Sequence, residues 1–190
     1  PPKVSQIDEK QTKSKRIKEI PHNIKTNVFI RNAKPARQLE YATGRICAGK
    51  VISKLGFKDI NIIKTGRDSE PIWPSGIVGS ISHSKNYFTV VGALSKDYTS
   101  LGIDVEKLDK KISDEAFYLI ANKEEIEFIN NDLENLKIAQ KYRVLIFSAK
   151  ETLFKLLYPI IKKKFSFDAA SIKIANLSLL NKNHGVYDIV

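Results

Sequence analysis

Two acidic side chains, placed two residues apart, give this chain its first chemical signal. The stretch 101–107 reads Leu-Gly-Ile-Asp-Val-Glu-Lys, and its alternation predicts a strand over residues 99–106 with Asp104 and Glu106 on one face. On a strand these two residues lie roughly 7 Å apart, where like charges repel unless a cation lies between them. Carboxylate oxygens suit Mg²⁺, which keeps water and phosphate oxygens as its other ligands. The alternative is an exposed edge strand with two solvated acids.

A second motif lies about 45 residues downstream, where residues 147–155 read Phe-Ser-Ala-Lys-Glu-Thr-Leu-Phe-Lys. The surrounding pattern predicts a helix over residues 136–158, ended by Pro159. Phe147, Glu151 and Lys155 then share one face of that helix. Glu151 and Lys155 could be an ordinary surface pair. However, much of the helix is apolar all round, which is typical of a buried helix, and a buried carboxylate needs a partner or a metal ion.

These two motifs together resemble those of the 4′-phosphopantetheinyl transferases, in the group that includes the activating enzymes of surfactin and enterobactin synthesis. Two further segments match the same pattern: residues 73–83 read Trp-Pro-Ser-Gly-Ile-Val-Gly-Ser-Ile-Ser-His, and residues 37–45 read Arg-Gln-Leu-Glu-Tyr-Ala-Thr-Gly-Arg. The resemblance covers roughly residues 36–170, with all four motifs in the family's order. Phe147 stands where many members carry Trp, Thr152 stands where Ala is usual, and many members continue further at the C-terminus.

The resemblance implies an enzyme that transfers 4′-phosphopantetheine from coenzyme A (CoA) to a serine of an apo acyl, peptidyl or aryl carrier protein, releasing adenosine 3′,5′-bisphosphate. It implies that Asp104, Glu106 and Glu151 hold Mg²⁺ or Mn²⁺ at the pyrophosphate. Glu151, or a metal-bound water, would take the serine proton. Lys155 would place its charge on a phosphate oxygen. Service to siderophore or antibiotic biosynthesis is implied as well.

The resemblance also implies a set of CoA contacts. The side chains expected at its phosphates are Arg37, Arg45, Ser82, His83, Lys150 and Lys155. Trp73 and Pro74 are expected to line the adenine pocket or, alternatively, to serve as a packing anchor in a turn-rich loop. Ser82 and His83 are expected at an exposed strand end. His83 could instead be structural, and Lys150 could be solvated.

The fold class implied is α+β, with two similar α/β halves in a pseudo-twofold arrangement, residues 1–108 and 109–190. The sequence pattern predicts a helix over residues 36–55 ended by Gly56, and strands over residues 60–64, 77–81, 87–94, 165–174, 177–180 and 186–190. Ser113 and the pair Asn122 and Glu125 should cap two helices. Glu124, Glu125 and Glu127 would form a solvated helix start, and residues 1–20 should be loosely attached.

Composition narrows the function classes. The 190 residues carry a net charge of +11, although residues 104–134 hold ten acidic and four basic side chains. Cys47, the single cysteine, excludes an intramolecular disulfide and is expected as a small buried residue. With no apolar run of 18 residues, we expect no membrane span. A cytoplasmic monomer is the expectation.

Two other functions remain open at this stage. Metal-dependent nucleases also combine a strand acid with a nearby Glu-x-Lys on a basic surface, but the spacing Glu151-x-x-x-Lys155 on a helix disfavours that mechanism. A non-catalytic basic module for nucleic acid or an acidic protein would need no metal. The sequence has no zinc-finger spacing and no basic-aromatic pattern, which makes nucleic acid the less favoured partner.

Overall fold

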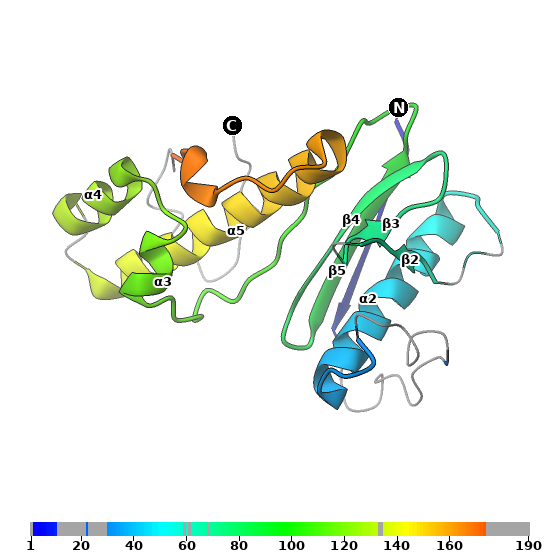
Figure 1. The fold of residues 1–190 in the computed structure, drawn as a ribbon, viewed down its shortest axis with the longest axis horizontal. Coiled ribbons are helices and arrows are strands. Elements are labelled where there is room, and N and C mark those ends of the chain that lie inside the picture. The colour runs from blue at the N-terminus through cyan, green and yellow to red at the C-terminus, as the bar shows by residue number, and fades with distance from the viewer. Residues whose placement is uncertain are drawn as a thin grey trace. The chain divides into compact units, whose positions relative to one another are not determined.

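The computed structural model describes residues 2–10, 22, 30–58, 60, 62–67, 69–132 and 135–173. It divides into two compact units, Pro1–Val105 and Glu106–Val190, close to the boundary predicted after residue 108. Figure 1 labels the helices and strands in chain order. The described residues include antiparallel strands as well as helices, which agrees with the α+β class.

Unit 1 is built on a three-stranded antiparallel sheet in the order β1 (Val4–Lys10), β5 (Tyr87–Leu94) and β4 (Ile77–Ser84), with helix α2 (Pro35–Lys54) on one face (Figure 1). The strands predicted over residues 77–81 and 87–94 are confirmed, and β4 continues further than expected, to Ser84. A short ribbon of β2 (Lys64–Thr65) and β3 (Pro71–Ile72) lies in the stretch where a strand over residues 60–64 and then a loop were predicted.

Small residues allow helix α2 to lie close to the sheet. The helix starts with Pro35 at its first position and ends before Gly56, whose φ of 99° suits glycine, so the predicted helix and its stop are confirmed. A Cβ at Gly44 would come within 3.2 Å of Ile81, which shows how closely helix and strand approach. Val51, Ile52, Val90 and their neighbours then form the core of this unit.

Strand β1 corrects the expectation that the start of the chain is loosely attached. Residues 4–10 pair with β5, with Ile7 opposite Val90, whereas residues 11–20 lie outside the described residues. Glu9 accepts hydrogen bonds from Lys50 Nζ at 2.9 Å and from Cys47 Sγ at 3.4 Å, which ties β1 to α2. Burial, aided by the charge of Glu9, raises the pKa of the Cys47 thiol to about 12.

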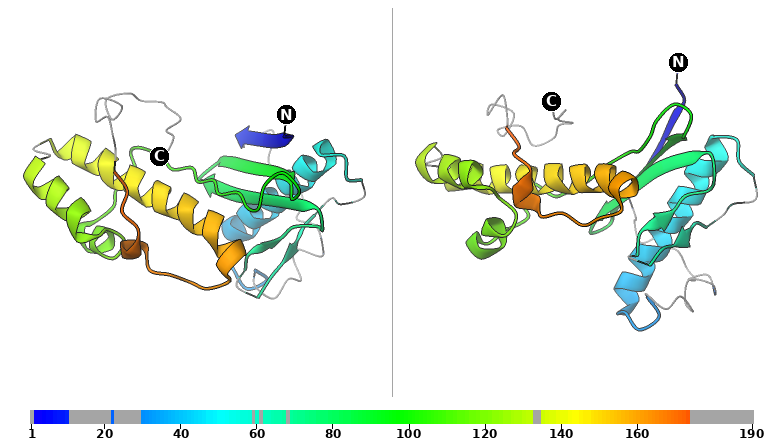
Figure 2. Two further views of the ribbon diagram at one scale, coloured as in Figure 1. Left: turned by 90° about the horizontal axis from the view of Figure 1, so that it is seen from above. Right: turned by 45° about the horizontal axis from the view of Figure 1, so that its top comes forward.

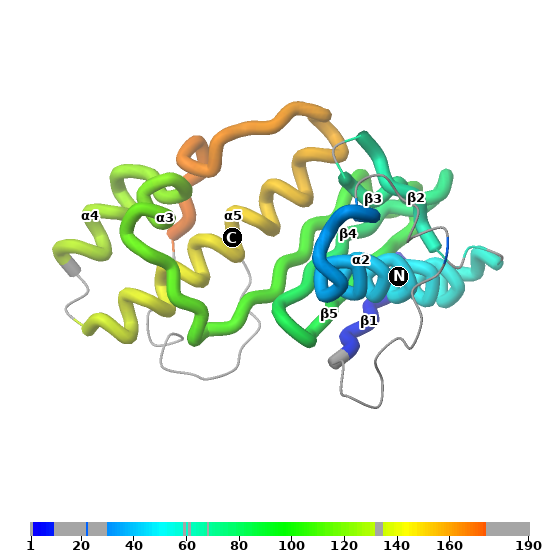
Figure 3. The backbone as a smooth tube through the Cα atoms, turned by 60° about the horizontal axis from the view of Figure 1, so that its bottom comes forward, coloured from blue at the N-terminus to red at the C-terminus, as the bar shows by residue number. Residues whose placement is uncertain are grey.

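The described part of unit 2 is helical. The long helix α5 (Leu136–Ile161) has α3 (Asp114–Tyr118) and α4 (Lys123–Asp132) beside it, as Figure 3 shows. Both predicted helix starts are confirmed: Ser113 Oγ accepts from Ala116 N at 3.2 Å, and Asn122 and Glu125 form a reciprocal capping box. The core between these helices includes Phe117, Ile129, Tyr142, Val144 and Ile146.

The end of α5 differs from the prediction in two ways. The helix passes through Pro159 and ends at Ile161, because Pro159 removes one backbone donor but Lys162 N still donates to Tyr158 O at 2.9 Å. Beyond it, Phe154 packs against Phe165 and Phe167. The strand predicted over residues 165–174 is wrong in its described part, which holds a 3₁₀ turn, η1 (Phe167–Ala169) (Figure 2). The strands predicted over residues 177–180 and 186–190 lie outside the described residues.

None of the helices in the described ranges is both long enough and apolar enough to cross a membrane.

We predict that Cys47 reacts slowly with a disulfide reagent in the folded chain at pH 8. A buried thiol with a pKa of about 12 is almost wholly protonated at that pH, and the thiolate is the reactive form. Following the release of chromophore from such a reagent should give a rate at least about 100-fold lower for the native chain than for the chain in guanidinium. Equal rates would show that Cys47 is not buried in this way.

Candidate active site

Asp104 is held by side chains and not by strand pairing, so the predicted strand over residues 99–106 is wrong. Ile103 N donates to Ser80 Oγ at 3.1 Å, and Val105 N donates to Ser82 Oγ at 3.2 Å. Ser82 Oγ in turn donates to Asp104 Oδ1 at 2.7 Å. Two serine hydroxyls therefore replace the backbone acceptors that a neighbouring strand would supply. The burial of residues 101–106 is uniformly intermediate and does not alternate as in a half-buried strand.

Glu106 begins unit 2 and pairs with Lys110, four residues on. Lys110 Nζ also lies 4.1 Å from the centre of the Phe147 ring, a cation–π contact. Because Phe147 precedes Glu151 by one helical turn, this contact anchors the segment that carries Glu106 to the helix that carries Glu151.

The residues that follow Lys110 in the sequence make further contacts with α5. Gln140 on α5 uses its amide as a strand would use its backbone, donating to Ile112 O at 3.0 Å and accepting from Ile112 N at 3.2 Å. Arg143 donates to the same carbonyl at 3.2 Å and pairs with Asp114 at 2.5 Å. The acidic segment of unit 2 is thus fixed to α5 along three successive turns of that helix, at residues 140, 143 and 147.

Glu151 and Lys155 lie on α5 with 3.8 Å between carboxylate and ammonium. Their side chains are 27% and 25% exposed, so both remain within reach of a ligand. The predicted sharing of a face by these two residues is confirmed.

The three predicted metal ligands offer the hard oxygen donors that Mg²⁺ prefers. Asp104 belongs to unit 1, whereas Glu106 and Glu151 belong to unit 2. In the described stretches of the chain, no group of three His, Cys, Asp or Glu side chains is gathered into a metal site. The metal triad therefore stays a prediction.

Lys150 is part of the core, which corrects its predicted place at a CoA phosphate or in solvent. It is 1% exposed, and its Nζ donates to Glu125 Oε2 at 2.6 Å and to Ile120 O at 2.9 Å. Consecutive residues on a helix point about 100° apart, so Lys150 faces the core while its neighbour Glu151 faces outward. A buried ammonium occupied by two acceptors is not available to a phosphate.

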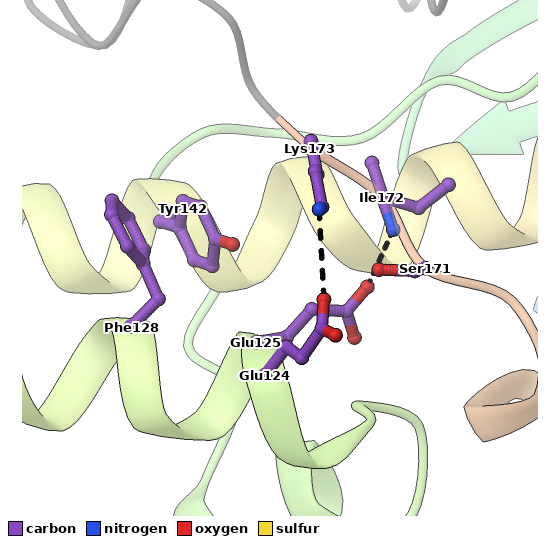
Figure 4. A pocket seen from close by; sticks show the side chains of 7 residues that line it. All are labelled: Glu124, Glu125, Phe128, Tyr142, Ser171, Ile172 and Lys173. Atoms are coloured by element: carbon purple, nitrogen blue, oxygen red, sulfur yellow. Dashed lines mark hydrogen bonds and ion pairs between the residues drawn. The ribbon is translucent and has the colours of Figure 1, made fainter.

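Glu125 is the partner that satisfies this charge, so its predicted place on a solvated face is also wrong. Besides Lys150, it accepts from Asn122 N at 2.9 Å and from Ile172 N at 2.8 Å, the second of which Figure 4 draws. A cavity of about 320 Å³ opens beside it, and the predicted site residues are absent from its lining. Burial, together with the charge of Glu125, raises the pKa of Tyr142 in that lining to about 12.

Arg37 and His83, both expected at CoA phosphates, lie side by side. Arg37 Nη1 lies 2.9 Å from His83 Nε2, and the imidazole stacks on Phe88 with 5.5 Å between ring centres. Because a guanidinium can only donate, Nε2 accepts in this contact and the ring proton lies on Nδ1. Arg37 Nη1 also lies 3.5 Å from Glu40 Oε2, one turn further along α2.

Ser82 does not share that position, although it precedes His83 in the sequence. Both residues lie in the last three positions of β4, as predicted, but Ser82 is only 4% exposed and so is not the exposed residue expected there. Neighbouring residues of a strand point to opposite faces: His83 is on the face of Ile81, toward α2, and Ser82 is on the other. The two side chains therefore point away from each other, and the phosphate contacts expected of them stay predictions.

The remaining predicted CoA contacts are more enclosed than expected. Arg45 is 6% exposed, lies 4.6 Å from the centre of the Tyr41 ring and donates to Ser69 O at 3.3 Å. Burial lowers the pKa of this guanidinium, and Tyr41 partly opposes the shift. Trp73 is partly buried against the core of unit 1, and a Cβ on Gly79 would lie 2.5 Å from its ring. Pro74 O accepts from Ile77 N at 3.1 Å. The packing-anchor interpretation fits these two residues better than an adenine pocket.

Comparison with known proteins agrees with the motifs. Residues 25–93 match the family model described as the 4′-phosphopantetheinyl transferase N-terminal domain, and residues 100–184 match that of the 4′-phosphopantetheinyl transferase superfamily. The chain belongs to the 4′-phosphopantetheinyl transferase superfamily. The first of these matches contains Arg37 and His83, and the second contains Asp104, Glu106 and Glu151.

Similar members of the superfamily come from several bacteria. The chain is 32% identical to 4′-phosphopantetheinyl transferase Svp of Streptomyces mobaraensis over 76% of its own length, and 30% identical to PptT of Mycobacterium tuberculosis over 72%. It is 29% identical to enterobactin synthase component D of Salmonella typhimurium over 72% of its length. These matches span 58%, 58% and 53% of the three relatives, so the chain corresponds to little more than half of each.

Several residues that shape the site gave no separate signal in the sequence analysis. Ser80, Lys110 and Gln140 each fix an acid-bearing segment, yet each is a common polar residue. One pattern could have indicated it: Ser80, Ser82 and Ser84 alternate along β4 and so lie on a single face of the strand.

We predict that Lys150→Met destabilises the chain strongly, because it leaves the Glu125 carboxylate buried without its cation. The free energy of unfolding, measured by urea titration with circular dichroism, should fall by about 3–5 kcal/mol. The matched control is Lys155→Met on the same helix, where loss of a partly exposed pair should cost less than about 1 kcal/mol. Equal effects of the two substitutions would contradict the buried assignment.

Proposed function

We propose that this chain carries the activity of its superfamily: transfer of 4′-phosphopantetheine from CoA to a serine hydroxyl of an apo carrier protein. The observation that carries the proposal is the match of both halves of the chain to 4′-phosphopantetheinyl transferase models, with the acidic residues and the helix motif inside the second match. The basic net charge of +11 suits a polyphosphate substrate and an acidic protein partner.

Asp104, Glu106 and Glu151 are the residues we propose as ligands of Mg²⁺ or Mn²⁺. When bound, the ion would neutralise charge on the pyrophosphate and orient it. The donor set fits a hard divalent cation, since all three are carboxylates. The residues described above that hold these acids support the assignment, because each one is fixed by a specific contact: Asp104 by Ser82, Glu106 by Lys110, and Glu151 by Lys155.

In the proposed reaction, the carrier serine oxygen forms a new bond to the phosphorus that bears pantetheine. The bond from that phosphorus to the bridging oxygen of the pyrophosphate breaks, and adenosine 3′,5′-bisphosphate leaves with the bond's electron pair. Glu151 is our candidate for the base that takes the serine proton, since its carboxylate is accessible. Lys155, one turn further, would place a cation on a phosphate oxygen.

Arg37 and His83 are the best-supported contacts for a CoA phosphate. They come from α2 and β4, lie 2.9 Å apart and offer a guanidinium fork beside an imidazole. Arg45 is also proposed as a phosphate contact. Its buried guanidinium stacks on Tyr41, and both residues lie on α2.

The finer features of the family belong to the same proposal. The pseudo-twofold arrangement is supported by a long helix in each unit, α2 and α5. A monomer is the expected working state. Relatives named enterobactin synthase component D favour a siderophore carrier protein as the acceptor. The cytoplasmic location stays a prediction.

We predict that an apo carrier protein gains the mass of one phosphopantetheine group when it is incubated with this chain, CoA and Mg²⁺. Intact-mass spectrometry measures the gain, and EDTA should abolish it because the metal is needed at the pyrophosphate. If acyl, peptidyl and aryl carriers all stayed unmodified while calorimetry detected CoA binding, the choice of acceptors would be at fault. If CoA did not bind either, the proposed function would be wrong for this chain.

We also predict that Asp104→Ala and Glu151→Gln each lower the turnover number at least about 1,000-fold, as expected when a charge-stabilising group of the transition state is lost. The same mass assay, run as a time course, gives the rates. Lys123→Ala is the control, since Lys123 is highly exposed on α4 and pairs only loosely with Glu127 at 3.6 Å. Near-normal turnover of either acid variant in excess Mg²⁺ would remove that residue from the metal site.

A further inference from the structure

Two serines of β4 hold the segment that carries Asp104. Ser80 and Ser82 are 3% and 4% exposed, and they are separated by two positions, so their hydroxyls lie on the same face of the strand. The amide of Ile103 donates to the first hydroxyl and the amide of Val105 to the second, at 3.1 and 3.2 Å. The residue between those amides is Asp104, which accepts the Ser82 hydroxyl hydrogen at 2.7 Å.

We propose that Ser82 is a positioning residue for the metal-binding carboxylate of Asp104, and that Ser80 secures the backbone on the preceding side. This inference rests on the proposed function. A serine hydroxyl has one hydrogen to donate, and in Ser82 that hydrogen is directed at Asp104 Oδ1. One of its lone pairs takes the Val105 amide. Ser82 therefore fixes both the side chain of the acid and the peptide that follows it, and its donor is not directed at a CoA phosphate.

The physical reason for such a contact lies in the demands of the ion. Mg²⁺ requires near-ideal octahedral geometry, so a carboxylate that rotates freely is a poor ligand. Partners that orient the ligands of a metal contribute about 10- to 100-fold in affinity or activity. The segment of Asp104 pairs with no strand in the part of the chain that the structure describes, so the serine hydroxyls supply the order that a sheet would otherwise give.

The first test measures the contacts without metal or substrate, by amide hydrogen exchange of the full chain using NMR. In Ser82→Ala the Val105 amide should exchange at least about 10-fold faster, while the Ile103 amide keeps its rate, because each amide has a different acceptor. Ser80→Ala should show the reverse. Unchanged exchange of Val105 in Ser82→Ala would overturn the proposal whatever the enzyme's activity.

The second test separates the metal from CoA in the mass assay. Ser82→Ala should raise the Mg²⁺ concentration for half-maximal rate about 10- to 100-fold and leave the KM for CoA within about twofold, whereas Ser82→Thr, which keeps a hydroxyl, should recover most of the metal dependence. If Ser82→Ala does not fold, Ser82→Cys replaces it, because its thiol is of similar size but a weak donor. It should also raise the Mg²⁺ concentration for half-maximal rate.

Thr89→Val is the matched control. Thr89 is the register partner of Ser82 on β5, is 3% exposed, and its hydroxyl has no hydrogen-bond partner among the described residues. It should change neither the metal dependence nor the exchange of Val105. A raised KM for CoA with unchanged Mg²⁺ dependence in Ser82→Ala would identify Ser82 as a phosphate contact and refute the positioning function. An inactive wild-type chain would refute the proposed function instead, and the exchange data would still test the serine contacts.

Discussion

A peptide group that leaves water needs a hydrogen-bond partner. In residues 103–112, which carry Asp104 and Glu106, side chains supply several of these partners. Ser80 and Ser82 satisfy amides of this segment in unit 1, and Gln140 satisfies Ile112 in unit 2. Within the described residues, the segment belongs to neither of the two sheets. The acids keep defined positions through the side chains that hold this segment.

Helix α5 places two adjacent charged residues in opposite environments. Lys150 is buried against Glu125, and Glu151 is directed outward to Lys155. Because a buried ion pair is costly to desolvate, its value here lies less in stability than in fixing which face of the helix is inward. The pair joins α5 to the start of α4, and through Ile172 N it also holds the chain that follows η1. The rotation of α5, and with it the direction of Glu151, is set by that junction.

Local rules predicted the parts of the fold that depend on local chemistry. The span of α2, its Gly56 stop, the caps at Ser113 and Asn122, and strands β4 and β5 all follow from propensity and periodicity. The failures lie where distant residues decide. The alternation of residues 101–106 resembles a strand, but its partners are serine side chains twenty-three positions earlier. Lys150 resembles a surface lysine until Glu125 is placed beside it, and Pro159 fails to end a helix whose last turn is still bonded. For the site, the sequence alone proposed the three acids, Arg37 and His83, but it did not reveal Ser80, Lys110 and Gln140, which hold the segments around the acids.

Strand β4 carries two unrelated tasks on its two faces, with His83 directed to Arg37 and Ser82 directed to Asp104. Because side chains alternate along a strand, inserting or deleting one residue inside β4, between Ile77 and Ser82, would exchange these faces. The imidazole and the hydroxyl would then be lost from their partners in the same event. Among relatives, insertions and deletions should accordingly occur in the loop before Ile77 but not from Ser80 to His83. Substitutions can occur in that stretch, but its length should stay constant.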